Sequence, residues 1–166
     1  MLDLKLLGIY MNDHLAGSTA GVELAKRTAG ENEGSEYGEP LARVAKEIEE
    51  DRDALQRIMD ALEIKRDHPK VFAGWVAEKL GRLKPNGQLL GYSPLSRLVE
   101  LEGLAIGITG KLSLWEALLE VAGDDGPLDT AELKHLSERA DSQRAEIWRL
   151  RQRAAREAFA AKTPVA

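Results

Sequence analysis

The chain has 166 residues, of which 43% are hydrophobic and 31% are charged, and its formal net charge is -5 at pH 7. This length suits a single domain, and the composition provides enough apolar residues for a core. The acidic balance argues against a general nucleic-acid binder, which is usually basic. The sequence has no cysteine, which excludes disulfides, thiolate nucleophiles and zinc–thiolate sites.

Targeting and membrane signals are weak in this sequence. No apolar run approaches the roughly 20 residues that a helix needs to cross a bilayer. The first residues, Met1 to Leu7, contain an early acid and only a short apolar stretch, unlike a signal peptide. We therefore expect a cytoplasmic protein with no membrane partner and no nucleic-acid partner.

Apolar residues recur at three- and four-residue steps through most of the chain, and strand-like alternation is nearly absent. This periodicity is typical of amphipathic helices. Ser93 followed by Pro94, and Asp129 followed by Glu132, are typical helix starts. The predicted long helices cover residues 2–29, 36–63, 94–122 and 129–161, and a short amphipathic helix is predicted over 69–83.

The lengths of the connections predict how these helices are arranged. The first and last connections are short, so they favour two antiparallel hairpins. The middle connection, about thirty residues long, is long enough to place the third long helix parallel to the second. One long crossover between two hairpins is typical of ferritin-like bundles. The predicted fold is therefore an all-α, ferritin-like four-helix bundle, with residues 1–166 in one domain.

Small residues are concentrated in two of the predicted helices, at 16–21 and at Gly103, Gly107 and Gly110. A glycine inside a helix costs about 1 kcal/mol relative to alanine, so it needs a reason. At 1.5 Å per residue, the glycines at 17 and 21 fall level with those at 107 and 103. We favour close backbone contact between these two helices. The alternative is room for a buried ligand or for a partner's side chain.

Ferritin-like metal centres use glutamates from two helices and a Glu-x-x-His motif from each of the other two. Glu132 and His135 form the one match, in the first turn of the last helix. Glu47-x-x-Glu50 offers an oxygen-only alternative, but such pairs are common on helix surfaces. We therefore assign no metal ligand, no cofactor and no catalytic residue.

The helical rise also predicts two polar layers inside the bundle. His14 lies on the apolar stripe of the first helix, about 18 Å from its base. The residues expected at that height on the other helices are Asp51, Lys111 and Asp141. Those expected in a second layer, at about 30 Å, are Glu23, Glu102, Arg43 and Arg149 or Arg151. Structural salt-bridge layers are the favoured interpretation, and a polar pocket in which His14 titrates beside Asp51 is the alternative.

Four segments together look like an uncharacterised bacterial family of the ferritin-like superfamily, and the resemblance covers nearly the whole chain. They are Asn12–Gly17, Glu50–Arg52, Glu100–Glu102 and Gly110–Trp115. The resemblance implies a four-helix ferritin-like fold but no established activity. The superfamily's paired metal-binding motifs do not map onto this chain.

These observations leave three hypotheses for function. No recognisable catalytic set is present, so we favour a non-enzymatic protein that acts by association, as a homodimer or with a partner. The second hypothesis is an iron or manganese carboxylate protein with an oxygen-rich site. The third is small-molecule binding in a polar pocket around His14.

Overall fold

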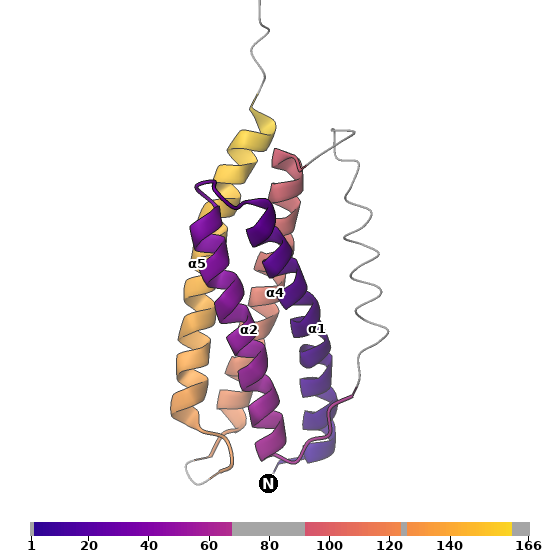
Figure 1. Ribbon diagram of the computed structural model, residues 1–166. Coiled ribbons are helices and arrows are strands. Elements are labelled where there is room, and N and C mark those ends of the chain that lie inside the picture. The colour runs from indigo at the N-terminus through magenta and orange to yellow at the C-terminus, as the bar shows by residue number, and fades with distance from the viewer. Residues whose placement is uncertain (1, 68–91, 124–125, 161–166) are drawn as a thin grey trace, which may run out of the picture.

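The computed structural model describes residues 2–67, 92–123 and 126–160. These residues form four long helices and no strand. The helices are α1 (Leu4–Glu31), α2 (Gly38–Ala61), α4 (Pro94–Val121) and α5 (Thr130–Phe159). The prediction of an all-α four-helix bundle is therefore confirmed (Figure 1). The short helix predicted over 69–83 lies outside the described residues.

The helices begin where side chains satisfy their first backbone N–H groups. The Asp3 carboxylate accepts hydrogen bonds of 3.1 Å at the start of α1. Ser93 accepts from the Ser96 N–H at the start of α4, and Asp129 accepts from the Ala131 N–H at the start of α5. The predicted starts at Ser93 and Asp129 are therefore confirmed.

The turn between α1 and α2 is tight enough to require glycine. A Cβ atom on Gly38 would lie 2.8 Å from the backbone oxygen of Asn32, closer than a side chain can approach. The turn makes α1 and α2 antiparallel neighbours. Helix α2 begins at Gly38, two residues after the start predicted from the sequence.

The start of α4 lies beside the end of α1. The Arg97 guanidinium donates to the Asn32 side chain, with 2.5 Å between Nε and Oδ1. Arg97 also pairs with Glu157, near the end of α5, at 2.9 Å. Helices α1 and α5 therefore run in one direction and α2 and α4 in the other, as Figure 1 shows. This order of directions agrees with two antiparallel hairpins whose inner helices are parallel.

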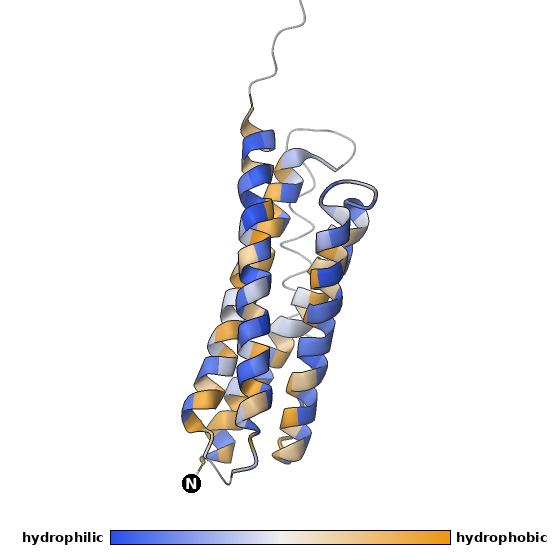
Figure 2. Ribbon diagram, turned by 90° about the vertical axis from the view of Figure 1, so that its left-hand side faces the viewer, coloured by the Kyte–Doolittle hydropathy of each residue, from blue (hydrophilic) through white to orange (hydrophobic). Residues whose placement is uncertain are grey.

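The core consists of two apolar clusters, one towards each end of the bundle. One includes Met11, Leu15, Met59 and Trp115, and the other includes Val22. Each helix also carries hydrophilic residues along its length (Figure 2), which fits amphipathic helices around a shared interior. None of the described helices is long and apolar enough to cross a membrane.

The boundary between the two clusters falls at a similar height on each helix. It lies between Ile48 and Ala54 on α2 and between Ile108 and Leu112 on α4. On α5 it lies between Ala140 and Ile147. The residues at this boundary are polar or small, and they form the candidate site.

Candidate functional site

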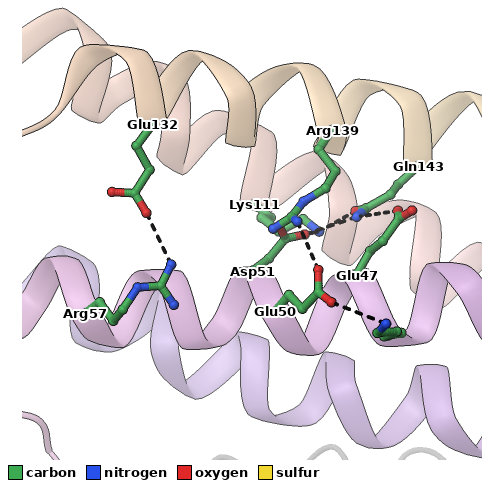
Figure 3. Close-up of polar contacts among 9 residues, drawn as sticks. Glu47, Glu50, Asp51, Arg57, Lys111, Glu132, Arg139 and Gln143 are labelled. Carbon is green, nitrogen blue, oxygen red and sulfur yellow. Dashed lines mark hydrogen bonds and ion pairs between the residues drawn. The ribbon is translucent and has the colours of Figure 1, made fainter.

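A buried carboxylate, Asp51, forms the centre of the polar layer between the two clusters (Figure 3). Its side chain is fully buried and pairs with both Lys111 and Arg139. The Arg139 Nε lies 2.8 Å from one carboxylate oxygen, and the Gln143 amide donates to the other at 3.1 Å. Buried charge is tolerated when it is paired and hydrogen-bonded. Asp51 meets this condition with donors from two other helices.

Two further glutamates of α2 extend this network towards the surface. Glu47 accepts from the Gln143 amide at 3.1 Å, and Glu50 pairs with Arg139 at 3.1 Å. The Lys111 ammonium donates to Gln143 Oε1 as well as to Asp51. Burial lowers the pKa of Lys111, and the nearby Asp51 carboxylate opposes this shift.

The structure brings together only part of the predicted lower layer. Asp51 and Lys111 are bonded to one another, and His14 lines the same cavity as both. Asp141 differs from the prediction, because it is exposed and pairs with Arg144 at 2.6 Å. Gln143 occupies the inward position on α5 instead.

The predicted upper layer lies on the surface rather than in the core. Glu23 is exposed. Glu102 is half-buried and lies 3.7 Å from Arg151, which is a long surface ion pair. The predicted cations Arg43 and Arg149 both pair with Glu146 of α5, at 3.6 and 2.6 Å. Such exposed pairs contribute about 0–1 kcal/mol each.

A buried polar cluster that the sequence analysis missed lies at the end of the bundle where α4 begins. Glu100 is 1% exposed and pairs with Arg27 of α1. The Tyr92 hydroxyl donates to Glu100 at 2.9 Å and accepts from the Asn32 amide at 2.9 Å. Burial raises the pKa of Tyr92, and the Glu100 carboxylate adds to this effect. The hydroxyl therefore stays protonated and closes this end of the core.

A cavity of about 280 Å³ lies between α1, α2 and α4 at the level of the polar layer. Its apolar wall includes Leu24, Ile48, Leu55, Leu104, Ile108 and Leu114. The polar residues that line it include His14, Asp51, Lys111 and Trp115. An apolar cavity with a few convergent polar groups, near 300 Å³ or larger, is typical of small-molecule sites.

Glycines create this space, which corrects the favoured interpretation of the small-residue stretches. A Cβ atom added at Gly17, Gly21, Gly107 or Gly110 would meet no described atom within 4 Å. Close backbone contact between α1 and α4 at these positions is therefore wrong. The alternative drawn from the sequence, room for a ligand, agrees with the cavity that these residues line.

Two side chains at the cavity, Trp115 and His14, have N–H groups or ring nitrogens without a hydrogen-bond partner among the described residues. Trp115 is 1% exposed, and its indole N–H has no hydrogen-bond partner among the described residues. An unsatisfied buried donor costs about 1–3 kcal/mol. His14 is half-buried, with its ring 4.6 Å from that of Tyr10. Burial lowers the pKa of His14 from its ordinary value of 6.5, although Asp13 opposes the shift, which favours the neutral imidazole at pH 7.

The two patterns considered as metal ligands in the sequence, Glu132 with His135 and Glu47 with Glu50, are not assembled inside the bundle. Glu132 pairs with Arg57 at 3.2 Å, as the left part of Figure 3 shows. His135 is exposed. Glu47 bonds to an amide and Glu50 to a guanidinium. Across residues 2–67, 92–123 and 126–160, no group of three or more histidines and acids is placed to hold a metal ion.

Comparison with known proteins gives no match: no family model fits the chain, and neither a curated protein nor a solved structure matches it significantly. Membership of a ferritin-like family therefore stays a prediction.

Proposed function

We propose that this protein binds a small organic molecule in the cavity between α1, α2 and α4. The observation that carries this proposal is the open space at four helix-interior glycines around one cavity. Each such glycine costs about 1 kcal/mol relative to alanine, and no close packing among the described residues explains it. Proteins commonly keep residues that lower their stability at sites where function requires them.

The size and lining of the cavity define what it can accept. Its volume of about 280 Å³ compares with about 30 Å³ for one water molecule in the liquid. Its walls are mainly leucine, isoleucine and glycine, and its polar groups are few. Gly17 and Gly107 are solvent-exposed, so a ligand can enter between α1 and α4. The expected ligand is therefore small and mostly apolar, with one polar group.

A panel of straight-chain probes tests the proposal: octan-1-ol, octanoate and octylamine, each titrated by calorimetry. We expect at least one probe to bind saturably with one site per chain. Gly107→Leu places a side chain in the open space and should weaken that binding by at least about tenfold. Thr109→Leu adds a similar side chain on another, exposed face of α4 and should leave it unchanged.

Two outcomes would contradict ligand binding in this cavity. One is that no probe binds the unaltered protein saturably. The other is that Gly107→Leu and Thr109→Leu bind the probe equally well, since the bound probe would then lie elsewhere.

Self-association is a second candidate, and exposed apolar residues along α4 and α5 favour it. Ile106 is 74% exposed and Trp148 is 51% exposed, and both line one groove between these helices. The groove also contains Glu102, Asp141, Arg144 and Arg151. An apolar centre surrounded by charges of both signs is complementary to a second copy of itself across a two-fold axis. The proposed occupant of the groove is therefore a second copy of this chain.

Sedimentation velocity over a range of concentrations tests this dimer. We expect a dimer in the unaltered protein and a monomer for Trp148→Glu, because a buried unpaired charge is costly. The matched control is Leu6→Glu, at a 64% exposed position on α1, which should remain dimeric. A monomer at all concentrations would contradict the candidate. A cytoplasmic location stays a prediction for either function.

A further inference from the structure

The Lys111 ammonium has one donor more than its protein partners use. An ammonium group has three N–H donors, and Lys111 donates to Asp51 Oδ2 and to Gln143 Oε1. No third acceptor contacts it among the described residues. Its side chain is 13% exposed and lines the cavity. The third N–H, on a side chain that lines the cavity, is therefore free of a described partner.

The carboxylate of Asp51, by contrast, is already fully occupied. Asp51 accepts from two nitrogens of Arg139, from Lys111 and from Gln143. An ionised carboxylate has about four lone-pair sites, so Asp51 has no capacity left for a ligand donor. A cationic ligand would therefore find no free acceptor at Asp51, and the other carboxylate that lines the cavity, Asp13, is exposed to solvent.

Trp115 adds a second unused donor to the same cavity. The indole nitrogen only donates, and it is buried without a partner in the described part of the chain. Neutral His14 has one N–H and one acceptor nitrogen, and no hydrogen bond to a described residue involves its ring. Asp13 also lines the cavity, but it is exposed to solvent. The unused donors of Lys111 and Trp115, by contrast, lie on largely buried side chains.

These donors lie towards one end of the cavity, and the apolar wall extends to the other. Gly103 faces Leu24, and this contact fixes the register of α4 against α1. Lys111 is eight positions along α4 from Gly103, or about 12 Å. His14 is ten positions from Leu24 on the antiparallel helix, or about 15 Å. The polar groups are thus separated from the end of the cavity at Leu24 and Gly103 by roughly the length of a small amphipathic molecule.

We propose that the ligand is a small carboxylate with an extended apolar body, such as a medium-chain fatty acid. Its carboxylate accepts hydrogen bonds from Lys111 and Trp115, and its body lies along Gly107, Leu104 and Leu24. A carboxylate is acceptor-only when ionised, which matches the surplus of donors, and its bond to an ammonium is charge-assisted. This inference rests on the proposed binding function and names its ligand class.

The three straight-chain probes decide the head group on the unaltered protein. We expect octanoate to bind at least about tenfold more tightly than octan-1-ol, and octylamine to bind weakest because Asp51 has no free acceptor. Binding of octan-1-ol or octylamine as tightly as octanoate would overturn the carboxylate while leaving the cavity function intact. No saturable binding of any probe would overturn both.

Lys111→Met tests whether the ligand carboxylate bonds to the Lys111 ammonium, because methionine keeps most of the length of the side chain and removes the ammonium. We expect octanoate binding to fall to the level of octan-1-ol, and octan-1-ol binding to stay within about threefold. Trp115→Phe removes only the indole N–H and its second ring, and serves as the second variant if Lys111→Met does not fold. It too should weaken octanoate more than octan-1-ol. If octanoate retains its full preference in whichever of these variants folds, the assigned donors are wrong.

Discussion

Gly103 of α4 faces Leu24 of α1 so closely that a Cβ atom on the glycine would lie 3.0 Å from Leu24 Cδ2. One helical turn further along α4, at Gly107, the same two helices leave open space. The two helices therefore touch at Gly103 and are separated at Gly107. Packing against α1 requires a small residue at Gly103 but not at Gly107.

This contrast predicts that two alanine substitutions differ in their effect on stability. Gly107→Ala should raise the free energy of unfolding by up to about 1 kcal/mol, because alanine favours the helix and its Cβ atom meets no described atom within 4 Å. Gly103→Ala should gain less or lose stability, because Leu24 must move. Urea denaturation of both variants measures the difference. A loss of stability in Gly107→Ala would show that the glycine is needed for packing rather than for space.

The buried ion pairs predict a graded response at the polar layer. Asp51→Asn leaves Lys111 and Arg139 facing each other without their shared anion, and should cost about 3–5 kcal/mol of stability. Lys111→Met should cost less, about 1–3 kcal/mol, because Arg139 and Gln143 still bind Asp51.

Denaturant unfolding of the two variants checks this order. Asp141→Asn, at an exposed position, is the matched control and should change stability by no more than about 0.5 kcal/mol. If Asp51→Asn proves no more damaging than Asp141→Asn, Asp51 is not the buried centre of the network.

The sequence correctly predicted the helices and the meeting of Asp51 with Lys111, but not the α5 residue that joins them. Buried positions on α5 follow alternating steps of three and four, at 133, 136, 140, 143, 147, 150 and 154. Gln143 continues this rhythm, whereas Asp141 is one residue past buried Ala140 and points about 100° away. The spacing of the buried positions on α5 therefore indicated Gln143. The prediction of Asp141 was wrong because it used only the height of a residue along the helix and not the face on which it lies.

The cavity could not be predicted in the same way. Helical rise places Gly17 and Gly107 at one height, but height does not fix the distance between two helix axes. That distance depends on larger side chains elsewhere, such as Leu24 against Gly103. Glu100 was missed for a related reason. Its burial depends on Tyr92, Asn32 and Arg27, which come from other parts of the chain.

The half-buried His14 predicts a pH dependence of stability. Its folded-state pKa is lowered from the ordinary value of 6.5 by burial, so the unfolded chain binds a proton more readily. The contribution of His14 is fully present above pH 6.5 and is lost as the pH falls through the lower folded-state pKa. The charged groups that line the same cavity are Asp13 beside His14 and Asp51, Arg52 and Lys111 across the space.

Unfolding free energies measured between pH 8 and pH 5 test this dependence. His14→Gln should remove part of the loss of stability on acidification, and His135→Gln, at an exposed position, should retain the full loss. An identical pH profile for the wild type and His14→Gln would contradict the burial of His14.

The Glu100 cluster predicts that one hydroxyl stabilises the end of the bundle. Tyr92→Phe removes a donor to Glu100 and an acceptor from Asn32, and should cost about 1–3 kcal/mol. Tyr10→Phe is the control, since no described residue bonds to the Tyr10 hydroxyl, and it should have an effect within about 0.5 kcal/mol. Equal effects in thermal unfolding of the two variants would show that the cluster contributes no specific stability.

The most direct measurement of the central claim is an NMR titration of the indole N–H of Trp115 with octanoate, assigned with Trp115→Phe. Occupation of the cavity predicts a saturable change in the resonance of Trp115 and no change for Trp148, which lies in the α4–α5 groove. A Trp115 resonance that stays fixed up to high concentrations of octanoate and of the other two probes, or a shift of Trp148 alone, would contradict ligand binding between α1, α2 and α4.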